Sequence, residues 1–210
     1  MKAIPDYFSR YIGALHQCLD SLIVTDLRHE PLPADAAFER LCALSADVQE
    51  RGGRQYLCGN GASAAFANHM ALDWTKNGGV PTYSFSDASL ITAMGNDLGY
   101  DEVFAAPLGW YGRKGDLLLT ISSSGNSPNI LRTIAVAREQ GLKVVTLSGL
   151  KTDNQSRQLG DLNFYVPAKT YGIVECAHQV LLHVWLDRFL GLEEWNREAP
   201  QNMRASEYQA

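Results

Sequence analysis

The chain of 210 residues is long enough for one sizeable core, and its composition, 46% hydrophobic and 20% charged, is that of an ordinary globular domain. A formal net charge of −5 without any run of Lys or Arg argues against a nucleic-acid surface held by phosphate contacts. No apolar run approaches the roughly 20 residues that cross a bilayer, and the N-terminus lacks the apolar stretch of a signal peptide. We therefore expect a cytoplasmic protein without nucleic-acid or membrane partners, and the four scattered cysteines, which form no CxxC pair, are expected to be reduced thiols.

The first fifty residues predict two amphipathic helices. Apolar residues recur at helical spacing from Tyr7 to Leu27 and again from Asp35 to Arg51, and Pro31 and Pro33 separate the two patterns. The broad apolar stripe of the first helix needs a partner, which is either its own subunit or another one. We expect both helices to precede the first strand.

Strands and helices alternate along the rest of the chain. The predicted strands are 55–58, 82–85, 116–121, 143–147 and 163–166, and the predicted helices are 64–75, 89–94, 102–110, 130–140 and 174–190. This order predicts one domain built on a parallel sheet covered on both faces, with ligands beyond the carboxyl ends of the strands. The polar segment 193–210 is expected to be a loosely ordered tail.

Four serines follow an apolar strand in the segment Thr120-Ile-Ser-Ser-Ser-Gly-Asn-Ser-Pro-Asn129. They occupy the turn into the next helix, where backbone N–H groups favour an anion and hydroxyls add neutral donors. The segment therefore predicts a cradle for a phosphate group. The same residues are also typical of an ordinary turn in which Ser127 caps the helix and Pro128 takes its first position.

A second anion-friendly turn follows the first predicted strand, in Leu57-Cys-Gly-Asn-Gly-Ala-Ser63. Gly59 and Gly61 are able to take conformations barred to other residues, and Ser63 stands at a helix N-terminus. The turn lacks the third glycine and the downstream acidic residue of a dinucleotide fingerprint, so a Rossmann cofactor site is the less favoured interpretation.

With Met94-Gly-Asn-Asp-Leu-Gly-Tyr-Asp-Glu-Val-Phe104 between them, the two turns closely resemble the sugar isomerase (SIS) family and, within it, the phosphoheptose isomerases. The resemblance covers about residues 55–190. It implies an α/β fold, in which a single SIS domain has a flavodoxin-like parallel sheet flanked by helices and an N-terminal helical extension. It also implies a homotetramer, with residues 1–52 serving oligomerisation, residues 53–192 forming the phosphosugar-binding core and residues 193–210 forming the tail.

The resemblance also assigns residues to the substrate. It implies that the sugar phosphate is held by Ser122, Ser123, Ser124 and Ser127, and that the remaining substrate-binding residues are Asn60, Gly61, Ser63, Asp97 and Glu175. For the Asn96-Asp97 pair, a turn or helix cap is an equal alternative.

Two predicted helices carry candidate acid and base groups. His69 and Asp73 are four residues apart on one helix face, and Glu175 and His183, eight residues apart, are separated by about 80° in projection. Both spacings match the family's His-x3-Glu and Gln-x7-His, with Asp73 in place of the glutamate and Glu175 in place of the glutamine. His178, three residues after Glu175, is the alternative to His183.

An aldose–ketose isomerisation needs a base for the carbon-bound proton and an acid at the carbonyl oxygen. We assign Asp73 as the catalytic base and His183 as the group that moves protons between the oxygens, or the reverse. Some family members carry zinc on the corresponding set, here His69, Asp73, Glu175 and His183, whose ligand types suit Zn²⁺ and harder divalent ions. The alternative is that Glu175 pairs with a surface Lys or Arg and that the histidines are packed in the core.

The resemblance implies isomerisation of sedoheptulose 7-phosphate to D-glycero-D-manno-heptose 7-phosphate, which is used in surface polysaccharides. The segment from Lys169 to Val174 departs from the family, because it replaces a stretch that usually carries an Asp-Arg pair. This departure affects the expected identity of the sugar more than the expected binding of its phosphate. The alternatives are an isomerase of another sugar phosphate, or a non-catalytic relative that senses phosphosugars or binds the replication initiator.

Overall fold

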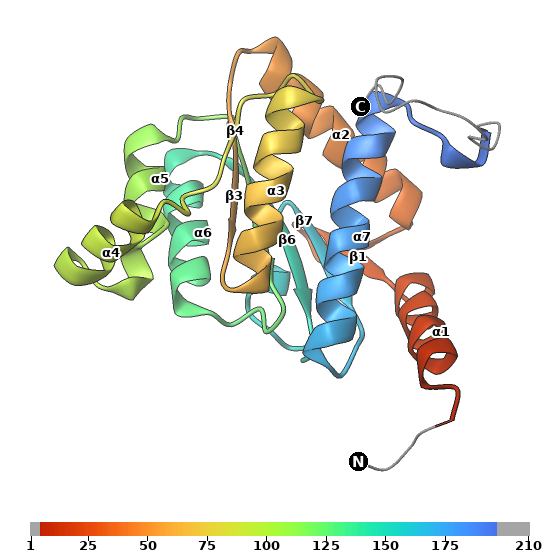
Figure 1. The fold of residues 1–210 in the computed structure, drawn as a ribbon. Coiled ribbons are helices and arrows are strands. Elements are labelled where there is room, and N and C mark those ends of the chain that lie inside the picture. The colour runs from red at the N-terminus through yellow and green to blue at the C-terminus, as the bar shows by residue number, and fades with distance from the viewer. Residues whose placement is uncertain (1–4, 197–210) are drawn as a thin grey trace, which may run out of the picture.

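The computed structural model in Figure 1 describes residues 5–196, which form a seven-stranded sheet between two layers of helices. Across the sheet the strands are β2 (Pro31–Leu32), β1 (Ile23–Asp26), β7 (Leu162–Val166), β6 (Lys143–Gly149), β5 (Leu117–Ser122), β3 (Gln55–Gly59) and β4 (Thr82–Tyr83). The strands from β7 to β4 are parallel, whereas β1 is antiparallel to β2 and to β7. The predicted α/β class, with a mostly parallel sheet flanked by helices, is confirmed.

Helices cover both faces of the sheet. One face is covered by α2 (Ala34–Glu50), α3 (Ala62–Lys76) and α7 (Tyr171–Leu190), with α1 (Tyr7–Asp20) packed against α7. The other face is covered by α4 (Ala88–Asp97), α5 (Ala105–Tyr111) and α6 (Pro128–Gln140). Short 3-10 helices span Tyr100–Glu102, Ser156–Gln158 and Glu194–Asn196. All residues of β3 and β5 are buried, as expected for parallel strands covered on both faces.

The edge formed by β1 and β2 corrects the prediction that two helices precede the first strand. The first helix ends at Asp20 instead of Leu27, and β1 pairs with the edge of β7 that would otherwise remain open. The turn between β1 and β2 is held by the Asp26 carboxylate, which accepts hydrogen bonds from the backbone N–H groups of Arg28 and Glu30. Helical spacing and a short edge strand gave the same apolar pattern here, and pairing with β7 decided between them.

Two further predictions of element bounds change slightly. The predicted strand 82–85 is shorter, and the predicted helix 102–110 divides into the 3-10 helix Tyr100–Glu102 and α5. Residues 197–210 of the predicted tail lie outside the described part of the chain. Within residues 5–196, no helix is long and apolar enough to cross a membrane.

The two N-terminal helices differ in how they pack. In α2, Phe38, Leu41 and Val48 belong to the main hydrophobic core. No residue of α1 is buried, although Leu15 and Leu19 pack against the core from its edge. The apolar stripe of α1 is therefore only partly covered within one subunit.

Candidate active site

The serine turn follows β5 at the carboxyl edge of the sheet. Ser122 and Ser123 are buried, and the Ser122 and Ser127 hydroxyl oxygens lie 3.4 Å apart. Ser127 is the N-cap residue of α6, but its side chain accepts no capping hydrogen bond. The Ser123 Oγ is buried and has no hydrogen-bond partner among the described residues. Donors that the fold leaves unused at a helix start are suited to binding an anion.

The turn is held in shape by Gly125 and Asn154. Gly125 has φ +63° and its N–H donates to the Ser122 carbonyl and hydroxyl oxygens. The Asn154 side chain is fully buried, and a Cβ on Gly125 would overlap it. The Asn154 amide in turn donates to the carbonyls of Gly149 and Lys151. The loops after β5 and β6 therefore form one packed unit.

The turn after β3 is tied to the serine turn. The Asn60 and Asn129 amides donate to each other's oxygens, both at 2.9 Å, and the Tyr100 hydroxyl donates to Asn60 at 3.2 Å. Gly59 is needed because a Cβ there would lie 2.6 Å from the Ser63 Cβ. These contacts hold the start of α3 beside the serine turn.

A cavity of about 120 Å³ opens between the two turns and the start of α7. It is lined by Asn60, Ser63, Ile121, Ser122, Ser123, Ser124, Ser127, Tyr171 and Glu175. The structure therefore brings together seven of the nine residues predicted to bind substrate. Gly61 precedes α3 at the same turn, whereas Asp97 lies exposed at the end of α4, where its carboxylate accepts a hydrogen bond from the Asn96 amide.

A second cluster lies further along α3 and α7, which run side by side (Figure 1). His69 Nε2 is 3.3 Å from an Asp73 carboxylate oxygen, and the His69 and His183 ring centroids are 5.4 Å apart. One ligand atom from each of His69, Asp73 and His183 lies within 4.8 Å of the others. Donor atoms around one tetrahedral zinc lie about 3.3 Å apart, so small side-chain rotations would fit these three residues to one ion.

Glu175 does not belong to this second cluster, although the sequence places it in the same predicted metal set. Its side chain lines the serine cavity instead, about 12 Å from His183 along the axis of α7 at 1.5 Å per residue. No Lys or Arg within residues 5–196 forms an ion pair with it, so the surface-pair alternative has no support there.

His178 is fully buried and points to β6, where its Nε2 donates to the Ser148 carbonyl at 3.2 Å. Burial lowers the pKa of His178 to about 4, which keeps the ring neutral near pH 7. His183, rather than His178, therefore faces His69 and Asp73.

Three residues of this region were missed by the sequence reasoning. Asn129 and Tyr100 fix Asn60, and Tyr171 lines the serine cavity beside Glu175. Asn129 and Tyr100 gave a usable signal, because each belongs to a segment that carries the family resemblance, whereas Tyr171 reaches the site only through tertiary packing.

Residues 28–149 match the profile of the SIS domain. The chain belongs to the SIS domain family. It is 38% identical to the phosphoheptose isomerases of Escherichia fergusonii and of an Escherichia coli strain, over 154 residues that cover 70% of this chain and 80% of each relative. The resemblance predicted from the two turns is confirmed at the level of the family.

Solved structures of similar proteins agree with this family. This SIS domain protein is 28% identical to the phosphoheptose isomerase of Neisseria gonorrhoeae, with a TM-score of 0.75 over 87% of this chain and 95% of that one. A phosphoheptose isomerase from Francisella tularensis is 26% identical, with a TM-score of 0.76 over 90% of this chain and 98% of that one.

We predict that Gly125→Ala weakens the binding of inorganic phosphate by about tenfold or more, because the new Cβ would displace the serine turn from Asn154. Isothermal titration calorimetry measures this. The matched control is Gly52→Ala, since Gly52 also has φ +63° but has no atom within 4 Å of its added Cβ. Equal phosphate affinity in both variants would contradict the role of Gly125.

We predict that His178 makes stability depend on pH. Its folded-state pKa is lower than the ordinary value of 6.5, so its contribution to stability is full above pH 6.5 and is lost as the pH falls toward 4. The loss is about 3 kcal/mol in the free energy of unfolding. Urea titrations should show that His178→Gln flattens this part of the profile, whereas His16→Gln, on the surface of α1, leaves it unchanged.

Proposed function

We propose that this protein is an aldose–ketose isomerase that converts sedoheptulose 7-phosphate to D-glycero-D-manno-heptose 7-phosphate. The proposal is supported by the likeness to phosphoheptose isomerases and carried by one observation. The serine cavity and the cluster of His69, Asp73 and His183 lie on the same two helices, α3 and α7.

The separation of these two sites suits a substrate with a phosphate at one end and reacting carbons at the other. Ser63 lines the serine cavity, and His69 lies about 9 Å further along the axis of α3 at 1.5 Å per residue. On this arrangement the serines hold the phosphate, and Asn60, Ser63, Tyr171 and Glu175 contact the middle of the sugar. Asp97 stays a predicted sugar contact, although it is not among the residues that line the cavity.

The chemistry needs two proton transfers. Asp73 takes the proton from C1 of the ketose and returns it to C2, and the electron pair of the C1–H bond forms the C1–C2 double bond of an enediol. His183 moves a proton from the C1 oxygen to the C2 oxygen, which leaves the aldehyde at C1. His69, whose Nε2 lies 3.3 Å from an Asp73 carboxylate oxygen, orients the carboxylate.

We also propose that His69, Asp73 and His183 hold a divalent cation, with zinc as the expected ion. Two imidazoles and one carboxylate form a common catalytic zinc set. With a cation bound, His183 would hold the ion instead of moving protons, and the ion would polarise the carbonyl oxygen of the substrate.

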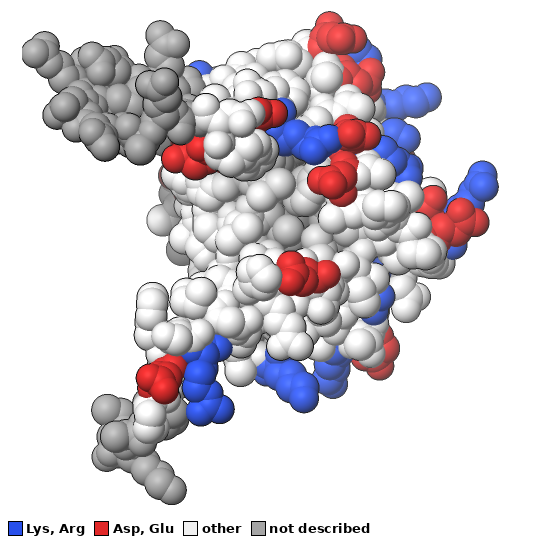
Figure 2. All heavy atoms as spheres, turned by 90° about the vertical axis from the view of Figure 1, so that its right-hand side faces the viewer, with Lys and Arg blue, Asp and Glu red and all other residues white. Residues whose placement is uncertain are grey.

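A homotetramer remains part of the proposal. Figure 2 views the molecule from the right-hand side of Figure 1, and charged side chains gather toward the upper, right-hand and lower parts of this face, whereas the area between them is largely uncharged apart from an acidic group near its centre. Phe8 and Ile12 of α1 and Val180 and Val184 of α7 are exposed apolar residues on helices that pack together. Such a surface fits the packing of N-terminal helices between subunits. Residues 1–52 as an oligomerisation segment and a cytoplasmic location stay predictions.

We predict that the wild-type protein isomerises sedoheptulose 7-phosphate and that Asp73→Asn and His183→Ala each lower kcat by about 10²-fold to 10⁴-fold. Their substrate affinity should remain within about threefold, because the serine cavity is intact. Proton NMR of the sugar measures turnover and calorimetry measures binding.

The chain offers a matched control for this experiment. His16 and Asp20 form the same His-x3-Asp pair at 3.2 Å on the exposed face of α1, so His16→Ala and Asp20→Asn should leave turnover unchanged. Tight binding without turnover by the wild type would favour the phosphosugar sensor instead. If only a five- or six-carbon sugar phosphate is turned over, that sugar is the substrate, and the proposed aldose–ketose isomerisation still holds.

For the metal, we predict about one zinc per chain by elemental analysis after dialysis, a loss of that zinc in His69→Ala and Asp73→Asn, and its retention in His16→Ala. Glu175→Ala should also keep zinc, because Glu175 lines the serine cavity. Loss of zinc in Glu175→Ala would make Glu175 the fourth ligand.

A further inference from the structure

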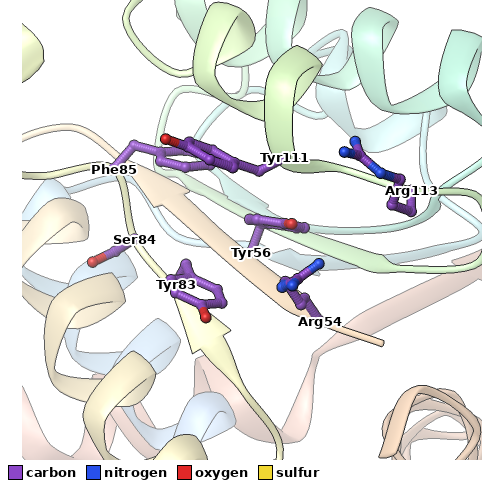
Figure 3. Close-up of a pocket in the computed structure, with 7 residues that line it drawn as sticks. All are labelled: Arg54, Tyr56, Tyr83, Ser84, Phe85, Tyr111 and Arg113. Carbon is purple, nitrogen blue, oxygen red and sulfur yellow. The ribbon is translucent and has the colours of Figure 1, made fainter. Parts of the chain in front are cut away.

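A second cavity lies at the other end of β3. It has a volume of about 510 Å³, within the range of small-molecule sites, and Figure 3 shows its lining. Arg54 precedes β3, and Asn60 of the serine site follows it, so the length of the strand, about 17 Å, separates the two. The cavity therefore belongs to neither part of the proposed active site.

One wall of this cavity is a series of aromatic rings. Tyr83 stacks on Tyr56 at 6.1 Å between centroids, Tyr56 on Phe85 at 5.6 Å, and Phe85 on Tyr111 at 6.3 Å. Neighbouring planes differ by only 21–28°, and Tyr83 and Tyr111 are about half exposed. Such rings offer flat apolar faces to another planar group.

Two arginines stand at the opposite side of the cavity (Figure 3). The buried Asp116 carboxylate fixes their backbones, accepting the N–H of Arg54 at 3.0 Å and the N–H of Arg113 at 2.9 Å. Among residues 5–196, no carboxylate lies within ion-pair distance of either guanidinium. The Arg113 Nη1 donates to the carbonyls of Trp110 and Gly112, and its other N–H groups have no protein acceptor in the described part of the chain. Two guanidinium groups without a carboxylate partner in one cavity favour an anion, above all a phosphate.

The Tyr56 hydroxyl adds a second, independent sign of a ligand. Tyr56 is 1% exposed, and its hydroxyl is buried with no hydrogen-bond partner in the described part of the chain. In Figure 3 this hydroxyl lies on the side of Arg54 and Arg113. Burial raises the pKa of Tyr56 to about 12, so the group keeps its proton and remains a donor at neutral pH. A buried donor without a partner costs stability unless a ligand uses it.

We propose that this cavity binds a nucleoside monophosphate. The planar base lies against the rings of Tyr83 and Tyr111, and the phosphate accepts hydrogen bonds from Arg54, Arg113 and the Tyr56 hydroxyl. The base and the phosphate of the ligand each contact one side of the cavity. Inorganic phosphate and an uncharged aromatic compound would each contact only one side.

The test is a calorimetric titration of the full chain with AMP, adenosine and ribose 5-phosphate, performed in a Ser122→Ala, Ser127→Ala background to suppress phosphate binding at the serine turn. We expect AMP to bind at least about tenfold more tightly than either of the others, because only AMP has both a base and a phosphate. No binding of AMP at millimolar concentration, or an affinity equal to that of ribose 5-phosphate, would overturn the proposal.

Variants locate the site. Tyr56→Phe removes only the hydroxyl and Arg113→Gln changes an exposed side chain, so both should fold, and each should weaken AMP binding by about tenfold. Arg28→Gln, which removes an exposed guanidinium on the turn after β1, should have no effect. The opposite result would be that the Ser122→Ala, Ser127→Ala variant loses the AMP binding of the wild type, whereas Tyr56→Phe and Arg113→Gln leave it unchanged. That result would assign AMP binding to the serine turn and refute the proposed site. Because the readout is binding, its result does not depend on isomerase activity.

Discussion

The parallel pairing of β3, β5 and β6 is the constraint on which the candidate active site depends. Gly59 pairs with Ile121 and Ser122 pairs with Ser148, so three turns leave the sheet at one edge. Each parallel strand must continue into a crossover, and α3 and α6 therefore begin at that same edge. Helix N-termini with free N–H groups converge there because of the topology, before any side chain is considered.

Local contacts then turn this edge into a specific site. The Asn60–Asn129 pair joins the turns after β3 and β5, and Asn154 joins the turns after β5 and β6. Most polar side chains here are used to hold other loops, yet the Ser123 hydroxyl has no hydrogen-bond partner within residues 5–196. Polar groups that are buried and unpaired cost free energy, and a phosphate that accepts their hydrogen bonds would recover it.

The two helices α3 and α7 divide the proposed work along their length. Their N-terminal ends line the serine cavity, and His69, Asp73 and His183 lie two to three turns further along. The aromatic and arginine-lined cavity occupies the opposite end of β3, where Arg54, Arg113 and the Tyr56 hydroxyl are gathered. A rigid sheet keeps these regions apart, so each can be altered without rebuilding the other.

Sequence alone determined the α/β class, the two phosphate-type turns and the family, because strand–helix alternation and glycine or serine turns are local patterns. It also named His69, Asp73 and His183, whose spacing on helices is fixed by 3.6 residues per turn. It failed at Ile23–Asp26, where the apolar pattern fits a helix and a strand equally and only the open edge of β7 made it a strand. Only the tertiary structure separated His178 from His183, moved Glu175 to the serine cavity, and brought Arg54 and Arg113 together on Asp116. The reason is physical: which face of a helix is buried, and which distant residues meet, depends on packing between elements that no local spacing encodes.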